Sequence, residues 1–107
     1  MSISIKCGVV PNSEPKRFRE RGRLHRNIRI YLHSEDKDEL DNITKVTYIL
    51  HPTFKNRYRE SSNRIRNFEI RIWTYGYFKI TAELTFSDGK TEKISDFVKW
   101  PPISTKL

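Results

Sequence analysis

Few residues in this 107-residue chain could carry out chemistry, and they are widely spaced. The histidines are His25, His33 and His51, and the single cysteine is Cys7. None of them has the spacing of a zinc site, and no acid is placed to orient His51 toward Thr53 as a catalytic triad requires. With four glycines in all, the chain also has no glycine-rich phosphate-binding loop. We therefore expect no catalytic residues, no metal site and no cofactor.

One short acidic segment is a candidate for calcium binding, because hard cations prefer several oxygen ligands. Its carboxylates are Glu35, Asp36, Asp38, Glu39 and Asp41. The segment lacks the glycine and the ligand spacing of an EF-hand loop. We therefore interpret it as a solvated acidic loop.

Positive charge is the strongest signal in the composition. The net charge of +8 favours nucleic acid or an acidic protein as a partner, although charge runs are also common on ordinary solvated surfaces. The predicted basic surface comprises Lys16, Arg17, Arg19, Arg21, Arg23, Arg57 and Arg59. Arginines are also interspersed with aromatic residues, namely Tyr58, Trp73, Tyr75 and Tyr77. This mixture would suit single-stranded nucleic acid, since bases stack on rings while cations bind phosphates.

Two alternating segments dominate the later part of the chain. In residues 78–86, five apolar residues alternate with polar ones, a pattern that predicts a strand with one buried face. These apolar residues are Phe78, Ile80, Ala82, Leu84 and Phe86. Residues 67–73 alternate in the same way through Phe68, Ile70 and Ile72. We expect the two segments to form a hairpin whose turn is the aromatic-rich segment 73–77.

Weaker patterns predict the remaining elements. Further strands are expected over residues 2–7 at a sheet edge, 27–33, 45–51 and 91–94, with a last extended segment over 97–100. The sequence Ser-Asp-Gly-Lys at 87–90 is typical of a hairpin turn. Residues 34–42 are expected to be a loop with one helical turn around Leu40. Residues 55–66 show no clear period, so we interpret them as a long crossing connection.

The size and composition of the chain favour a single thin-cored domain over residues 1–107. Hydrophobic residues make up 36% and charged residues 32%. Several short strands in a lean chain predict an all-β, antiparallel β-sandwich. One cysteine excludes an internal disulfide, and no apolar run has membrane-spanning length, so a cytoplasmic setting without membrane contact is expected. Residues 10–24 are expected to be a basic loop that can be mobile until it contacts a partner.

Two short segments, taken together, resemble the YEATS domain family, and its prokaryotic branch (pYEATS) most closely. Residues 50–54 read Leu-His-Pro-Thr-Phe, and residues 74–78 read Thr-Tyr-Gly-Tyr-Phe. Family members carry Leu-His-Pro-Thr-Phe or His-Glu-Ser-Phe at the first place. They carry Gly-Trp-Gly-Glu-Phe or a close variant at the second, followed by an alternating strand like residues 79–86. The resemblance covers residues 26–100, with Thr74 in place of the first glycine and Tyr77 in place of the glutamate.

The resemblance implies an immunoglobulin-like β-sandwich that is a binding module and not an enzyme. Its loop tip would read an acylated lysine, acetyl or crotonyl, on a modified protein or peptide. The flat amide would lie between the rings of Phe54 and Tyr75, with the Thr53 hydroxyl bonded to it. The backbone N–H groups of Tyr75 and Gly76 would bind the acyl oxygen, and His51 would shape the wall. The ligand-binding set implied is His51, Thr53, Phe54, Thr74, Tyr75, Gly76 and Tyr77.

Alternatives remain open for these residues. Phe54 could plug the core at a strand end, and His51 could hydrogen-bond the loop backbone. The two motifs meet at one end of the sandwich only if residues 55–66 return to the opposite end, a span of about 40 Å that a dozen extended residues can cover. The alternative function is an arginine-rich module that binds nucleic acid or an acidic protein and has no acyl-lysine activity.

Overall fold

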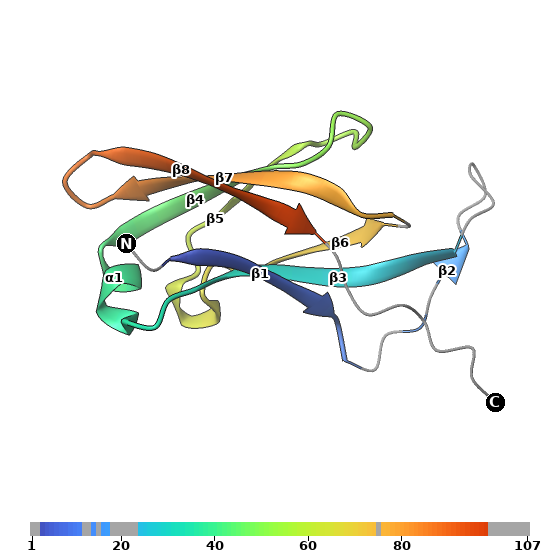
Figure 1. The fold of residues 1–107 in the computed structure, drawn as a ribbon, viewed down its shortest axis with the longest axis horizontal. Helices are drawn as coiled ribbons and strands as arrows, with labels where there is room; N and C mark the ends of the chain where they lie inside the picture. Colours follow the sequence, from blue (N-terminus) through green and yellow to red (C-terminus); the bar gives the residue numbers. More distant parts are fainter. Residues whose placement is uncertain (1–2, 12–13, 15, 18–23, 75, 99–107) are drawn as a thin grey trace.

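The protein is a sandwich of two antiparallel β-sheets, seen in a computed structural model that describes residues 3–11, 14, 16–17, 24–74 and 76–98 (Figure 1). The first sheet contains β1 (Ser4–Val9), β2 (Lys16–Arg17), β3 (Leu24–His33) and β6 (Ile70–Thr74). The second sheet has the order β5 (Tyr58–Ser61), β4 (Ile43–Ile49), β7 (Phe78–Phe86) and β8 (Thr91–Val98). A short helix, α1 (Lys37–Asp41), and a 3₁₀ turn, η1 (Arg64–Arg66), complete the described elements. The predicted all-β antiparallel sandwich is confirmed.

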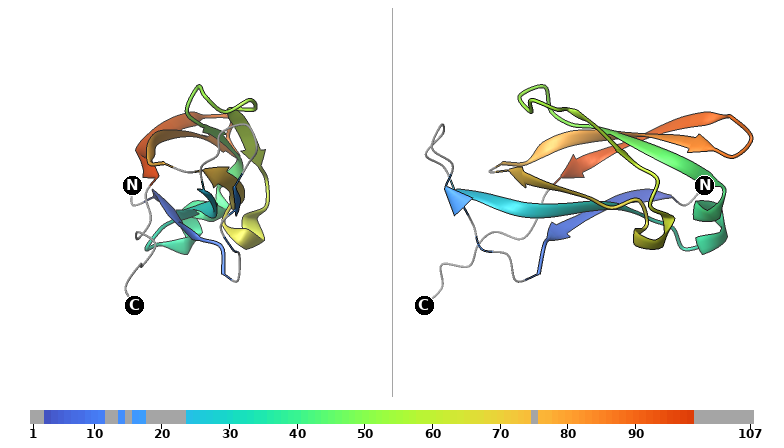
Figure 2. Two further views of the ribbon diagram at one scale, coloured as in Figure 1. Left: turned by 90° about the vertical axis from the view of Figure 1, so that its right-hand side faces the viewer. Right: turned by 180° about the vertical axis from the view of Figure 1, so that it is seen from behind.

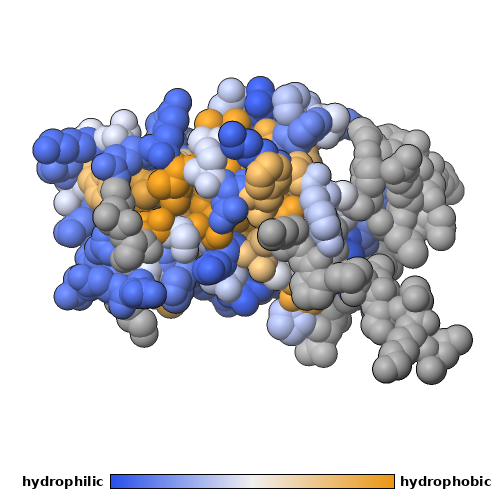
Figure 3. All heavy atoms as spheres, in the orientation of Figure 1, coloured by the Kyte–Doolittle hydropathy of each residue, from blue (hydrophilic) through white to orange (hydrophobic). Residues whose placement is uncertain are grey.

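The core lies between the two sheets and is built from alternate strand positions. Ile28, Ile30 and Leu32 of β3 are buried against Ile80 and Leu84 of β7 within one apolar cluster. Hydrophilic residues cover most of the face shown in Figure 3, and apolar surface appears between the sheets. This apolar surface lies along the side where β1 and β8 are edge strands. The thin core expected from the composition is therefore the layer between two sheets.

The expected hairpin over residues 67–86 is wrong. β6 pairs with β3 in the first sheet, whereas β7 pairs with β4 and β8 in the second. Residues 73–77 therefore cross from one sheet to the other at one end of the sandwich (Figures 1 and 2). Each of the two strands has an apolar face that must be covered, and facing sheets allow each strand to cover the other. Period-two alternation shows that a strand buries one face, but it does not show which sheet the strand joins.

The expected crossing connection over residues 55–66 also needs correction, because it contains β5 and η1. β5 pairs antiparallel with β4, placing Tyr58 opposite Ile49 and Ser61 opposite Val46. It forms an edge strand whose Tyr58 and Glu60 side chains are exposed, so it leaves no apolar period in the sequence. Its direction does return the chain to the far end of the sandwich, as the meeting of the two motifs requires.

Other elements match the sequence more closely. β1 lies at a sheet edge, α1 supplies the helical turn around Leu40, and the turn before Thr91 joins β7 to β8. β8 runs unbroken from Thr91 to Val98, so the strand and the extended segment expected there are one element. Within the expected basic loop, β2 pairs with the start of β3, which corrects the loop at Lys16 and Arg17. Residues 12–13, 15, 18–23 and 99–107 lie outside the described residues.

Two carboxylates of the acidic segment, Asp36 and Asp41, make structural contacts. The Asp36 carboxylate accepts a hydrogen bond from the Asp38 N–H at 3.0 Å and caps α1. Asp41 pairs with Arg64 at 2.8 Å. Within the described residues, no group of three acidic, histidine or cysteine side chains could hold a metal ion. None of the helices in that part of the chain is long and apolar enough to cross a membrane.

A strained corner joins η1 to β6 at the end opposite the sheet crossing. Asn67 and Phe68 both have positive φ angles, 54° and 61°, which are uncommon for residues other than glycine. The Phe68 ring is fully buried, and its N–H donates to the Asn63 carbonyl at 2.8 Å. Its carbonyl accepts from the buried Tyr48 hydroxyl at 2.8 Å. Burial, and secondly the charge of Glu69, raises the pKa of Tyr48, so this hydroxyl stays protonated and donating.

We predict that Tyr48→Phe destabilises the fold, because the buried Phe68 carbonyl loses its donor. The expected loss is about 1–3 kcal/mol in the free energy of unfolding, measured by urea denaturation. Tyr58→Phe is the matched control, since that side chain is 58% exposed, and it should change stability little. Equal stability of the Tyr48 variant and the wild type would show that this hydrogen bond does not hold the corner.

Glu69 fixes β6 to β3 through two arginines. Its carboxylate accepts from Arg29 Nε at 2.8 Å and from Arg71 Nε at 2.9 Å, and only 7% of its side chain is exposed. Burial alone would raise the pKa of Glu69, but the hydrogen bonds and charges of Arg71 and Arg29 outweigh it and lower this pKa below its usual value. Because the folded-state pKa lies below the unfolded-state value, ionised Glu69 stabilises the fold at neutral pH.

We therefore predict that the free energy of unfolding decreases as the pH falls below the usual titration range of glutamate, about pH 4. Glu69→Gln should flatten this part of the pH profile, because glutamine does not titrate. Thermal unfolding between neutral and acidic pH would measure both proteins. Parallel profiles would mean that Glu69 contributes nothing to the acid sensitivity.

Candidate functional site

The two motif segments meet around a cavity of about 310 Å³ at the end of the sandwich where the chain crosses between sheets. Its lining comes from the loop after β4, from the end of β6, the start of β7 and the residues between them, and from β3. The lining residues are His25, His51, Thr53, Phe54, Lys55, Trp73, Thr74, Gly76, Tyr77 and Phe78. A cavity of this volume is at the small end of ligand pockets, and suits a side chain or a small group.

The structure brings together every described member of the predicted ligand-binding set. His51, Thr53 and Phe54 lie on one side, and Thr74, Gly76 and Tyr77 come from the crossing segment. Tyr75 lies outside the described residues. The prediction missed the contribution of four lining residues, namely His25, Lys55, Trp73 and Phe78. Lys55 directly follows the first motif and Phe78 is the last residue of the second, so their positions in the sequence were the available signal.

The loop after β4 is fixed by hydrogen bonds within itself. The Phe54 N–H donates to the His51 carbonyl at 3.0 Å, which closes a tight turn over Pro52. The Thr53 N–H donates to Nδ1 of His51 at 3.2 Å, and the Thr53 hydroxyl lies 2.9 Å from the same nitrogen. Since an N–H can only donate, Nδ1 is the accepting nitrogen in the contact with the Thr53 N–H. His51 therefore orients Thr53, and the expected bonding of His51 to loop backbone is confirmed.

This geometry leaves the Thr53 hydroxyl ready to accept a further hydrogen bond. When this hydroxyl donates to Nδ1 of His51, 2.9 Å away, the lone pairs of its oxygen remain for another donor. Thr53 is exposed on the cavity lining. The position can therefore accept from the N–H of a ligand amide.

Phe54 serves both the cavity and the core. Its ring lies 5.3 Å from the ring of Phe78, tilted by 53°, and it packs against the apolar cluster while remaining partly exposed. The base of its loop is closed by the Leu50 N–H, which donates to the Arg57 carbonyl at 2.7 Å. The Phe54 ring therefore packs at the edge of the core, as the first interpretation expected, and it also lines the cavity.

The crossing segment forms a compact turn at Thr74. This side chain is 5% exposed, and its hydroxyl donates to the Gly76 carbonyl at 3.2 Å. The Gly76 N–H approaches the same hydroxyl at 3.5 Å, a long and weak contact. Thr74, which stands in place of a glycine in the family pattern, thus stabilises the turn. Tyr77 is 56% exposed and lies at the mouth of the cavity.

The cavity has a positive electrostatic character. Lys55 contributes an ammonium group, and among its described lining residues no carboxylate is present. Two arginines of the predicted basic surface stabilise the loop after β4. Arg57 Nε donates to the Leu50 carbonyl at 3.3 Å, and Arg59 Nε donates to the Asn56 carbonyl at 2.6 Å. Lys16 and Arg17 lie in β2, and Arg19, Arg21 and Arg23 fall outside the described residues. The basic residues are thus partly structural.

The described strands form an all-β antiparallel sandwich, with a small aromatic-lined cavity between the loops at one end. A family model described as the prokaryotic YEATS domain matches residues 26–99. The chain therefore belongs to the prokaryotic YEATS domain family, as the resemblance of its two motifs indicated.

Solved structures support the same fold. The structure of the yeast AF-9 homolog protein Yaf9 is 18% identical, with a TM-score of 0.66, covering 94% of this chain and 69% of that one. The Yaf9 YEATS domain bound to H3K27ac is 19% identical, with a TM-score of 0.63 and coverages of 94% and 70%. The Yaf9 YEATS domain recognizing an H3K122suc peptide is 20% identical, with a TM-score of 0.61 and coverages of 92% and 69%. A search of curated protein sequences gives no significant match.

We predict that Phe54→Ala lowers the free energy of unfolding by about 1–3 kcal/mol, because it removes a partly buried ring from the core edge. Tyr77→Ala, at an exposed position of the same cavity, should change stability by no more than about 0.5 kcal/mol. Chemical denaturation of the two variants measures the difference. Equal stabilities would show that Phe54 does not contribute to the core.

Proposed function

We propose that this domain is a non-catalytic, cytoplasmic binding module that reads an acylated lysine, acetyl or crotonyl, on a partner protein or peptide. The observation that carries the proposal is the meeting of the two family motifs around one small cavity with aromatic and hydroxyl lining. Two solved YEATS structures with the same fold are complexes with modified histone peptides. They support a modified peptide as the kind of partner.

The lining suits a flat, neutral amide. An amide stacked on the Phe54 ring gains contact with a π face, and in the proposal the Tyr75 ring covers its other side. The amide N–H would donate to the Thr53 hydroxyl, which His51 holds in an accepting orientation. The acyl oxygen would accept from backbone N–H groups of Tyr75 and Gly76. A buried amide would thus have partners for both of its polar atoms.

The same lining disfavours unmodified lysine. A lysine ammonium would enter a cavity that already contains Lys55 and, in its described lining, no carboxylate. It would lose hydration without gaining a counter-charge, which is costly. Acylation removes that charge and leaves a neutral amide in its place. The electrostatics of the cavity therefore provide the discrimination that a reader of this modification needs.

The test is a binding measurement with acetyl-lysine and crotonyl-lysine peptides against the unmodified peptide. We expect an affinity near ten micromolar, about 7 kcal/mol, and no measurable binding of the control peptide. Thr53→Val, which keeps the shape and removes the acceptor, should weaken binding about tenfold. Thr91→Val is the matched control at an exposed position near the far hairpin, and it should bind normally. Tyr75→Ala should abolish binding.

The rival function is an arginine-rich module for an acidic protein or nucleic acid, without acyl-lysine activity. It predicts that acetylated and unmodified peptides behave alike, and that Tyr75→Ala has no effect on partner binding. It also predicts a steep loss of affinity with salt. Peptide binding that ignores both the acyl group and Tyr75 would overturn the reader proposal.

A further inference from the structure

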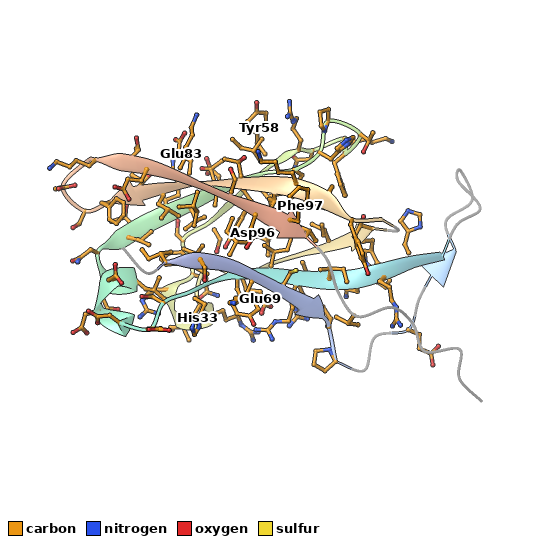
Figure 4. All side chains as sticks on the ribbon, viewed as in Figure 1. His33, Tyr58, Glu69, Glu83, Asp96 and Phe97 are labelled. Carbon is orange, nitrogen blue, oxygen red and sulfur yellow. The ribbon has the colours of Figure 1, made fainter. Side chains whose placement is uncertain are left out.

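Two arginines oppose each other on the outer face of the first sheet, the face turned away from the core. Arg29 of β3 and Arg71 of β6 are direct cross-strand partners. Like charges in this position are destabilising, so their placement needs an explanation. Part of the explanation is Glu69, whose buried carboxylate accepts hydrogen bonds from the Nε atoms of both arginines. Figure 4 shows Glu69 on the side of the first sheet that faces away from the second.

The shared carboxylate fixes both guanidinium groups while using only part of their donors. Each arginine donates through Nε, and no described residue accepts from the terminal nitrogens of either one. Arg29 is further held over the ring of Tyr31, 4.3 Å from its centroid. The side chains remain 36% and 49% exposed. Two oriented guanidinium groups with unused donors have the form of an oxyanion-binding pair.

The neighbouring positions on this face add charge and leave space. Lys6 of β1 lies opposite Tyr31, and Gly8 lies opposite Arg29. A Cβ built on Gly8 would meet nothing within 4 Å, so the space beside the Arg29 position is open. Lys6, Arg29 and Arg71 against the single Glu69 leave this face with an excess of two positive charges.

Two aromatic side chains accompany these cations on the outer face. Tyr31 of β3 lies opposite Lys6, and Trp73 of β6 lies opposite Asn27; both are half-buried. Three cations on neighbouring strands, with rings beside them, suit the phosphates and bases of a single strand.

The second sheet provides the contrast. On its outer face, Lys45 pairs with Glu60 at 3.7 Å, and Lys93 pairs with Glu83 at 3.9 Å. These charges neutralise one another across neighbouring strands. The positive excess of the described strands is therefore concentrated on the first sheet.

We infer that the outer face of the first sheet is a phosphate-binding surface for single-stranded nucleic acid, in which Arg29 and Arg71 clamp the backbone. This surface adjoins the end cavity at Trp73, which also lines that cavity. The inference does not depend on the acyl-lysine proposal. Phosphate is the favoured oxyanion because a nucleic acid strand carries one charge per nucleotide and can engage Lys6, Arg29 and Arg71 together, while its bases stack on the rings of Tyr31 and Trp73.

The test is fluorescence anisotropy with a short, labelled, mixed-sequence single-stranded oligonucleotide over a range of salt concentrations. Removing both arginines alone would leave Glu69 buried and unpaired, so the variant is Arg29→Gln/Glu69→Gln/Arg71→Gln. It should bind about tenfold or more weakly, and its log–log salt slope should be lower by about 1.4, or about 0.7 for each lost phosphate contact. The matched variant Lys45→Gln/Glu60→Gln/Lys93→Gln has the same change in net charge and should bind like the wild type.

The single variant Glu69→Gln distinguishes binding by two oriented arginines from attraction by net charge alone. It makes the protein more positive, so attraction by net charge predicts tighter binding of the oligonucleotide. The clamp predicts weaker binding, because the arginines lose the charge that orients them. Equal losses in the two triple variants, or tighter binding of Glu69→Gln, would overturn the proposal. Polyglutamate that competes as well as the oligonucleotide would overturn the assignment to nucleic acid.

Discussion

The crossing of the chain from the first sheet to the second, between β6 and β7, is the constraint on which the candidate site depends. Each of these strands has one apolar face, and because the strands lie in opposite sheets, both faces are buried in the same core. The connection must therefore bridge the end of the sandwich. It does so beside the loop after β4, where Thr74 closes the turn and Phe54 anchors the facing loop. The cavity is a consequence of how the core is closed.

The site also links stability to binding. Phe54 packs on Phe78 while lining the cavity, so the same ring supports the core and shapes the pocket. His51 and Thr53 are arranged by local hydrogen bonds and need no distant partner. A pocket preorganised in this way can bind a small group without ordering its walls first, which lowers the entropic cost of binding. The corner at Phe68, which is not part of the cavity lining, is held by the Tyr48 hydroxyl.

Much of the fold was predictable from the sequence, and the errors have a common physical cause. The alternation from Phe78 to Phe86 and the Asp-Gly turn are local signals, and both predicted their elements correctly. β5 was not predicted because an edge strand with exposed Tyr58 and Glu60 side chains shows no apolar period in the sequence. The hairpin over residues 67–86 was wrong because alternation does not specify a partner strand. The cavity residues were found from motif order, whereas the Arg29–Glu69–Arg71 cluster depends on a cross-strand register that no local pattern contains.

The most direct test of the central claim is a chemical-shift titration of the ¹⁵N-labelled domain with an acetyl-lysine peptide, using the unmodified peptide as control. The claim is that the end cavity binds the acylated side chain. It predicts shifts confined to Thr53, Phe54 and the segment from Tyr75 to Phe78, with no response to the control. Silence at millimolar peptide, or shifts centred on the outer face of either sheet, would contradict it.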